Sequence, residues 1–314
     1  MGRLLSVQFA VADRLVLAKV RERLGGRIRF MISGSAALSP DIAMWFRTAG
    51  LTLIEGYALT ETGSGSDALA AATTAVLTPD GQHYVLNGAK QFVLDGHSAD
   101  QLVVVARSRG TAGATDGISL FLVDANAPGI TRKRSLLMDS RNAARIEFAN
   151  VDVGADALLG TEGAAWPALE QVLDRGRAAI AAEMLGGVRE AFERTVDYLK
   201  QREQFGTKIG TFQALQHRAA HMFSEIELLK SVVLDACANV DANPALLPLS
   251  ASLAKTKANE TFELVSNEAV QMHGGIGTTD ELDIGLFLKR SRVAMQILGD
   301  ARFHRARYAT LRGF

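Results

Sequence analysis

The sequence predicts an α+β fold: a short α/β fragment, then an antiparallel β-barrel or sandwich domain, then a C-terminal helical bundle. Three changes of pattern support this prediction. Residues 1–62 mix helical spacing with short apolar runs, residues 63–160 carry several short strands, and residues 161–314 carry apolar stripes at helical spacing. A chain of 314 residues is long enough for two or three domains. We expect three domains with these boundaries.

The pattern of the first 62 residues predicts an α/β fragment. Residues 28–32 and 51–54 are short apolar runs of the kind found in buried strands. Between them, Ser39 and Pro40 form a helix start signal, and we expect a helix from there through Trp45.

The second stretch is rich in predicted strands. We expect them at residues 83–86, 102–106, 118–123 and 144–148, each bounded by polar or glycine-containing turns. The first follows the turn at residues 79–81, where Pro, Asp and Gly stand together. Several short strands separated by turns are typical of an antiparallel barrel or sandwich.

The third stretch is helical. Apolar residues recur at spacings of three and four along residues 180–199, 215–233 and 262–272. Three such stripes predict a four-helix-type bundle, in which each helix buries one face. Pro244 and Pro248 stand where two of the helices should be joined.

Composition excludes several classes of protein. Lys plus Arg equals Asp plus Glu at 34 each, so no basic surplus points to nucleic acid. The single cysteine, Cys237, cannot form an internal disulfide and fits a reducing compartment. No apolar run is long enough for a membrane span and residues 1–20 do not form a secretory signal, so we expect a soluble cytoplasmic protein. The six histidines show no metal-ligand spacing, and we expect no metal.

Four motifs stand in order at residues 57–67, 86–96, 202–213 and 271–277. With them, the chain from residue 57 to the C-terminus resembles the acyl-CoA dehydrogenase family. The resemblance implies an FAD-dependent oxidoreductase of fatty acid metabolism, which removes two hydrogens from the α and β carbons of an acyl-CoA thioester. It also implies an electron-transferring flavoprotein as acceptor.

The resemblance assigns six residues of the first two motifs to the flavin: Leu59, Thr60, Gly65, Ser66, Phe92 and Leu94. Small glycine and serine residues let backbone N–H groups approach phosphate oxygens closely. The alternative for the first motif is a Gly/Ser-rich turn between domains. The family commonly has Trp and Thr where this chain has Phe92 and Leu94, so a hydroxyl that bonds the flavin is missing.

The other two motifs are similar to the clamp that holds the adenosine diphosphate of a neighbouring subunit's FAD. The matching residues are Arg202, Gln204, Phe205, Gln271, Gly274 and Gly275. An arginine fork suits a diphosphate, and a clamp of this kind implies a homo- or hetero-oligomer. The alternatives are a solvated helix end for Arg202 and a helix C-cap for the two glycines.

The family's catalytic carboxylate is absent from both positions where it is known. The usual base position falls on Leu298 and the alternative position on Gly176, so Asp300 is the nearest replacement. The alternative for Asp300 is a helix cap. Asp174 and Arg177 match positions that hold the CoA portion, with capping of a helix start as their alternative. These departures resemble a small-subunit variant of heteromeric family members.

The beginning of the chain resembles a different family. Residues 25–40 and 54–62 are similar to adenylate-forming acyl-CoA synthetases, and the family's N-terminal helical domain is expected to be missing. The sequence thus leaves three functions open. The first is acyl-CoA dehydrogenation, the second is a catalytically silent subunit that binds FAD or CoA, and the third is a ligase remnant, which is disfavoured because the phosphate-binding loop and catalytic lysine are missing.

Overall fold

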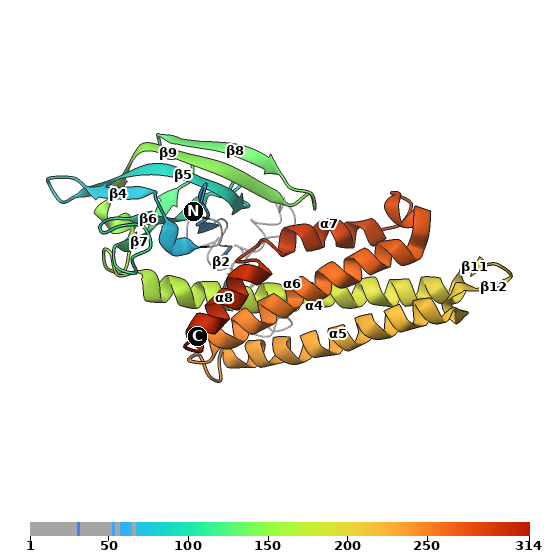
Figure 1. The fold of residues 1–314 in the computed structure, drawn as a ribbon. Helices are drawn as coiled ribbons and strands as arrows, with labels where there is room; N and C mark the ends of the chain where they lie inside the picture. Colours follow the sequence, from blue (N-terminus) through green and yellow to red (C-terminus); the bar gives the residue numbers. More distant parts are fainter. Residues whose placement is uncertain (1–29, 32–51, 54–56, 65–66) are drawn as a thin grey trace, which may run out of the picture. The chain divides into compact units, whose positions relative to one another are not determined.

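The computed structural model describes residues 30–31, 52–53, 57–64 and 67–314 (Figure 1). The chain divides into two compact units. The first comprises residues 1–62 and 71–163, and the second comprises residues 63–70 and 164–314. The predicted boundaries at residues 62 and 160 stay predictions.

The first unit is built on an eight-stranded sheet with the strand order β10-β7-β6-β4-β5-β9-β8 and with β3 beside β6 (Figure 1). Its strands are β3 (Tyr57–Ala58), β4 (Thr74–Leu77), β5 (His83–Leu94), β6 (Gln101–Arg107), β7 (Ile118–Asp124), β8 (Ile130–Leu136), β9 (Asn142–Gly154) and β10 (Leu158–Leu159). A single turn of 3-10 helix, η3 (Ala155–Ala157), also belongs to this unit. Another such turn, η2 (Ala68–Ala70), belongs to the second unit.

The four strands predicted in this stretch are confirmed, within β5, β6, β7 and β9. The sheet is mixed, so the antiparallel prediction was wrong for two pairs: β6 runs parallel to both β3 and β4. A closed barrel or a two-sheet sandwich is not confirmed. Alternate residues of the long strands are buried, among them Leu86, Leu102, Phe121 and Ile146, because successive side chains of a strand point to opposite faces.

Before residue 57, the structure describes β1 (Phe30–Met31) and β2 (Thr52–Leu53), which pair in parallel. Both lie within predicted strands, and parallel pairing is what an α/β fragment requires. The predicted helix through Trp45 lies outside the described residues.

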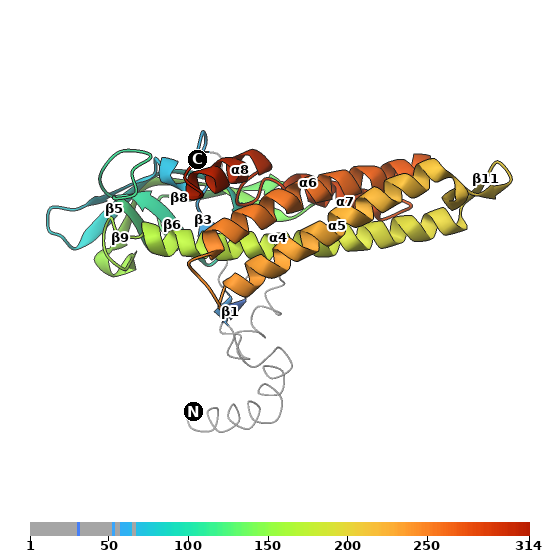
Figure 2. The same cartoon turned by 60° about the horizontal axis from the view of Figure 1, so that its bottom comes forward.

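The second unit is helical, as predicted. Its helices are α4 (Trp166–Gln201), α5 (Gln213–Asn239), α6 (Leu247–His273), α7 (Ile284–Ala294) and α8 (Ala301–Leu311). The three longest, α4, α5 and α6, lie side by side along their length (Figures 1 and 2). Between α4 and α5 stand a small hairpin, β11 (Glu203–Gln204) and β12 (Thr207–Lys208), and the short η4 (Ile209–Thr211). The turn η5 (Gly274–Thr278) follows α6.

The core of this unit follows the three predicted stripes. Met184 and Val188 from α4, Met222 from α5, and Phe262 and Val265 from α6 are all buried. Burying apolar area of this kind is the main favourable term in folding. The joint between α5 and α6 contains Pro244, and Pro248 lies in the first turn of α6, where a missing N–H costs nothing.

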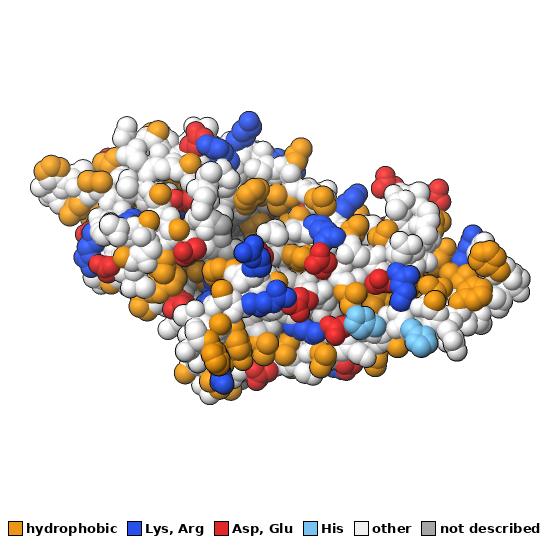
Figure 3. All heavy atoms as spheres, viewed as in Figure 1, with side chains coloured by type: hydrophobic (Ala, Val, Ile, Leu, Met, Phe, Trp, Pro, Cys, Tyr) orange, Lys and Arg blue, Asp and Glu red, His pale blue; other side chains and the backbone are white. Residues whose placement is uncertain are grey.

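The surface of the described residues carries charges of both signs, interspersed over the face seen in Figure 3. This agrees with a net charge of zero. In the part of the chain that the structure describes, no helix combines the length and apolarity needed to cross a membrane. Those same residues hold no group of three or more side chains suited to bind a metal ion.

Candidate active site

A buried ion pair fixes the loop after β3 in the first unit. Lys90 is fully buried in β5, and its Nζ lies 2.6 Å from Glu61 Oε1. The Glu61 carboxylate also accepts the backbone N–H groups of Ala72 at 2.7 Å and Thr73 at 3.0 Å. Burial alone would raise the pKa of Glu61, but the charge and hydrogen bond of Lys90 lower it. Glu61, whose role the sequence pattern did not suggest, is therefore an ionised anchor of the first motif.

The predicted flavin residues of this unit gather at an irregularity in β5. The pairing of β5 with β9 shifts register between Lys90 and Val93, and Phe92 adopts a φ of 52° with 58% of its surface exposed. The backbone N–H of Gln91 donates to the carbonyl of Thr60 at 2.7 Å, which joins the first motif to the second. Leu59, Thr60 and Leu94 are half-buried beside this irregularity, whereas Gly65 and Ser66 lie outside the described residues.

The two predicted clamp motifs lie at one end of the helical unit. The Tyr198 ring stacks on the His273 ring with 4.3 Å between centroids, and the Tyr198 hydroxyl donates to the His273 carbonyl. This contact brings together the C-terminal ends of α4 and α6. His273 is buried, and its Nδ1 is hydrogen-bonded to the Ala269 carbonyl at 2.7 Å, which indicates a structural role.

All six predicted clamp residues are exposed: Arg202, Gln204, Phe205, Gln271, Gly274 and Gly275. Phe205 is 91% exposed at the tip of the hairpin, where its φ is 54°. Gly274 ends α6 with a φ of 67°, as a C-cap glycine does. A Cβ added at either glycine would meet nothing within 4 Å. This end of the unit is therefore open to a ligand or another chain.

Asp174 and Arg177 form a buried charge network on α4. Asp174 Oδ1 accepts from Arg177 at 2.7 Å, and Oδ2 accepts from Arg307 of α8 at 2.8 Å. Burial lowers the pKa of Arg177, as does the nearby charge of Arg307, while Asp174 opposes the shift. The alternative that these two residues cap a helix start was wrong, because α4 begins at Trp166. Their assignment to CoA stays a prediction.

The two predicted base positions meet in space. A Cβ added to Gly176 would lie 2.8 Å from Leu298 Cδ1, so the two positions adjoin. Leu298 adopts a φ of 57°, and its carbonyl accepts from His304 Nε2 at 3.0 Å and Arg177 Nε at 3.4 Å. Asp300 is the N-cap of α8, with its Oδ1 accepting the Phe303 N–H at 2.8 Å. The capping alternative for Asp300 is observed, and its role as base stays a prediction.

Behind this turn lie three buried polar residues that sequence analysis missed: Lys255, Asn259 and His304. Burial lowers the pKa of Lys255 to about 7, with Asp300 opposing and Arg290 and Arg177 adding to the shift. Burial and the charges of Arg177, Lys255 and Arg307 lower the pKa of His304 to about 3, so it is neutral at physiological pH. Extending the stripe of Phe262 back by seven residues reaches Lys255, and this was the available signal.

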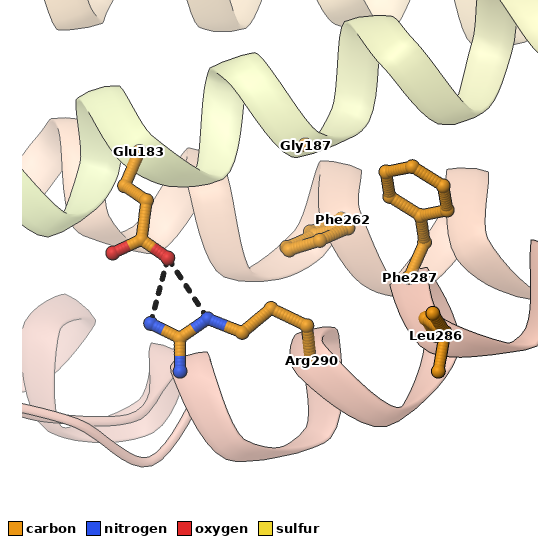
Figure 4. A pocket seen from close by; sticks show the side chains of 6 residues that line it. All are labelled: Glu183, Gly187, Phe262, Leu286, Phe287 and Arg290. Carbon is orange, nitrogen blue, oxygen red and sulfur yellow. Dashed lines mark hydrogen bonds and ion pairs between the residues drawn. The ribbon is translucent and has the colours of Figure 1, made fainter. Parts of the chain in front are cut away.

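A shallow pocket of about 270 Å³ lies on the second unit between α4, α6 and α7 (Figure 4). Phe262, Leu286 and Phe287 give it apolar walls beside Gly187. At one end the Glu183 carboxylate is bridged by Nε and Nη2 of Arg290, both at 2.8 Å. None of the predicted site residues lines this pocket.

Comparison with known families identifies both units. The acyl-CoA dehydrogenase middle domain matches residues 56–151, and the acyl-CoA dehydrogenase C-terminal domain matches residues 163–310. The sequence is 32% identical to cyclohex-1-ene-1-carbonyl-CoA dehydrogenase of Syntrophus aciditrophicus, over 87% of this chain and 66% of that protein. The chain spans 54% and 55% of the length of two mammalian short/branched chain specific acyl-CoA dehydrogenases.

Solved structures agree with these matches. The acyl-CoA dehydrogenase from Geobacillus kaustophilus superposes with a TM-score of 0.78 at 30% identity, covering 89% of this chain and 74% of that one. A structure described as the electron transferring flavoprotein of Acidaminococcus fermentans gives a TM-score of 0.77 at 32% identity, covering 86% of this chain and 71% of that one. The chain therefore belongs to the acyl-CoA dehydrogenase family.

Proposed function

We propose that this chain is an FAD-dependent acyl-CoA dehydrogenase-like oxidoreductase that performs α,β-dehydrogenation of an acyl-CoA thioester. The observation that carries the proposal is that the turn at Leu298, where the family's usual base position falls, keeps a built and strained geometry. Strained backbone of this kind persists where the surrounding structure enforces it, and it gathers at active sites.

The residues assigned to FAD fit the cofactor. Phe92 presents an exposed ring in the first unit, and Leu59 and Thr60 lie beside it on the loop anchored by Glu61. Arg202 and the open Gly274–Gly275 turn of the second unit suit a diphosphate, because an arginine fork and closely approaching backbone N–H groups both bind phosphate oxygens. When bound, the flavin would accept a hydride from the β carbon of the substrate.

Removal of the α-proton is the step that this chain performs poorly. Leu298 cannot accept a proton, and the loss of a general base lowers the rate by roughly 10²–10⁴. The backbone N–H of Leu298 serves as a donor to the thioester carbonyl, since that group does not depend on the side chain. Asp300 would have to leave its capping bond with Phe303 to act as base.

We further propose that the chain works in a homo- or hetero-oligomer, as a small-subunit-like partner of a competent dehydrogenase. The exposed hairpin at Phe205 supports this. An electron-transferring flavoprotein is the proposed acceptor, fatty acid metabolism the setting and the cytoplasm the location. We keep the division at residues 62 and 160, and the synthetase-like origin of residues 1–62, as proposals that rest on sequence.

A second candidate function is a catalytically silent subunit that binds FAD or CoA. One observation favours it: both base positions lack a carboxylate, and the Leu298 side chain occupies the space in front of Gly176. Such a subunit would retain the binding residues and stabilise a partner that carries the base.

Flavin bleaching separates the two candidates. The purified chain, with bound FAD, is mixed anaerobically with butyryl-CoA and other acyl-CoA esters, and the loss of flavin absorbance is followed. Bleaching supports the dehydrogenase and excludes the silent subunit, whereas a bound flavin that never bleaches contradicts the dehydrogenase proposal for the isolated chain.

Restoring the missing base sharpens this experiment. Leu298→Glu is expected to raise the bleaching rate by about 10²–10⁴. The matched control Leu298→Gln has the same size and no basic carboxylate, and should give no such gain. Equal rates in the two variants would mean that residue 298 does not face the α carbon.

A further inference from the structure

The turn at residues 297–300 is held by side chains from three helices. The Leu298 carbonyl accepts from Arg177 on α4 and His304 on α8. The next carbonyl, that of Gly299, accepts from Lys255 at 3.0 Å and Asn259 at 3.3 Å, both on α6. Two successive carbonyls therefore each receive two side-chain donors.

The side chains support a turn whose backbone conformation is unfavourable. Leu298 has a φ of 57° and Gly299 a φ of 121°, and leucine disfavours the left-handed region. A Cβ on Gly299 would lie 2.5 Å from His304 Nε2, so only glycine lets the imidazole approach this closely. The turn does not follow from local preference, since the surrounding side chains impose it.

Burial of Lys255 at its position is energetically unfavourable. It is fully buried on the apolar face of α6, where Ala251, Ala258 and Phe262 would favour another apolar side chain. Its Nζ lies 2.6 Å from Asn259 Oδ1, 3.1 Å from the Ala294 carbonyl and 3.0 Å from the Gly299 carbonyl. A buried amino group is tolerated only when it is hydrogen-bonded, and these bonds tie the end of α7 to the turn.

His304 completes the arrangement. It is fully buried, and it is neutral because its pKa is lowered to about 3 by burial and neighbouring positive charges. A carbonyl only accepts, so Nε2 must carry the proton that bonds Leu298. His304 thus acts as a fixed neutral donor whose tautomer is set by the turn.

We propose that Lys255, Asn259 and His304 are positioning residues that hold the turn so that residue 298 faces the acyl thioester. This inference rests on the proposed function. None of the three touches the reacting atoms, and each acts through the backbone of Leu298 or Gly299. The alternative is a purely structural C-terminal cap of α7, which would contribute stability without affecting the reaction.

The first test compares two lysines of one helix in the full chain with bound FAD. Lys255→Met removes the support of the turn. Lys257→Met is the control, because Lys257 is paired with Glu225 and does not contact the turn. Hydrogen exchange of residues 295–300 should rise about tenfold or more in the first variant, because the Lys255 hydrogen bonds to the turn are lost, and stay unchanged in the control. Unchanged exchange in Lys255→Met would overturn the proposal.

The second test asks whether the support of the turn by Lys255 affects the rate of flavin bleaching. In a Leu298→Glu background, Lys255→Met should lower the limiting bleaching rate about tenfold or more while half-saturation by acyl-CoA changes little. Lys257→Met should leave both within about twofold. If turn exchange rises but the rate does not fall, the turn is only a structural cap and the proposal is wrong.

A conservative rescue covers the case in which Lys255→Met does not fold. His304→Gln retains an N–H donor for the Leu298 carbonyl, and His304→Leu does not. In the Leu298→Glu background, the glutamine variant should bleach about tenfold faster than the leucine variant, and equal rates would overturn the proposal. If Leu298→Glu alone never bleaches, the proposed function fails, and the exchange comparison still decides whether these residues hold the turn.

Discussion

Replacing Lys90 with methionine tests whether the buried ion pair anchors the loop after β3. Methionine keeps the aliphatic stem and removes the ammonium group. Glu61 then loses the partner at 2.6 Å, but it keeps the N–H groups of Ala72 and Thr73. The carboxylate, only 7% exposed, then loses the ammonium group that neutralises it.

The expected loss of unfolding free energy depends on which partners Glu61 keeps. Removing one member of a buried ion pair typically costs about 3–5 kcal/mol of unfolding free energy, because the other charge stays buried and unpaired. The two remaining backbone donors place Lys90→Met near the lower end, at about 3 kcal/mol. A Lys90→Met/Glu61→Gln double variant removes both charges and should be more stable than the single variant.

The pH dependence has a definite sign. With Lys90 present, the folded-state pKa of Glu61 lies below its unfolded value, so this group contributes stability above that value and loses it as pH falls. Without Lys90, Glu61 loses the charge and the hydrogen bond that oppose burial, so its folded pKa is higher than in the unsubstituted chain. Protonation then relieves the buried charge, and the deficit of Lys90→Met should shrink as pH falls from 7 towards 5.

Urea unfolding followed by circular dichroism measures the loss, and hydrogen exchange of β5 reports on the first unit alone. The control is Arg145→Met, which removes an exposed pair with Glu147 and should cost less than about 1 kcal/mol. The reasoning is refuted if Lys90→Met costs no more than this control, or if its deficit is the same at both pH values.

Three further predictions concern the second unit. The pKa of His304 is lowered to about 3 in the folded chain, so the free energy of unfolding should decrease by up to about 1.4 kcal/mol for each pH unit as pH falls from 6.5 to 3. Acid unfolding of His304→Gln should lack this contribution. Asp300→Ala should cost about 1 kcal/mol in thermal unfolding through loss of the N-cap, without changing the bleaching rate of the chain that keeps Leu298; lost bleaching in that chain would instead identify Asp300 as its base. Gly299→Ala should destabilise by more than about 1 kcal/mol through its positive φ and clash with His304, whereas Gly186→Ala, at an open helical position, should stabilise by about 0.5–1 kcal/mol; urea midpoints that reverse this order would contradict the geometry.

Much of the fold could be predicted because its signals are local. The apolar runs at residues 102–106 and 118–123 and the stripes of the long helices depend only on periodicity. Strand β8 was missed because Arg132, Lys133 and Arg134 occupy its centre and conceal the alternation. The parallel pairing of β6 with β3 and β4 depends on contacts between distant segments, which no local pattern encodes.

The candidate site divides in the same way. The motif at Gly274 and the expected base position at Leu298 could be assigned from the family resemblance, because both stand in short motifs that keep their order along the chain. The supporting residues could not, since Lys255 and His304 are charged or titratable types that usually lie at the surface. Their burial is decided by partners on other helices, and only the folded chain brings those partners together.

The support of the turn at Leu298 has an evolutionary consequence. Because neighbouring side chains enforce the backbone geometry, residue 298 can be exchanged without the main chain following it. A carboxylate can therefore be placed at residue 298 by a single amino-acid replacement that leaves the backbone of the turn as it is. The backbone of the turn and the residue that it presents can therefore change independently of each other.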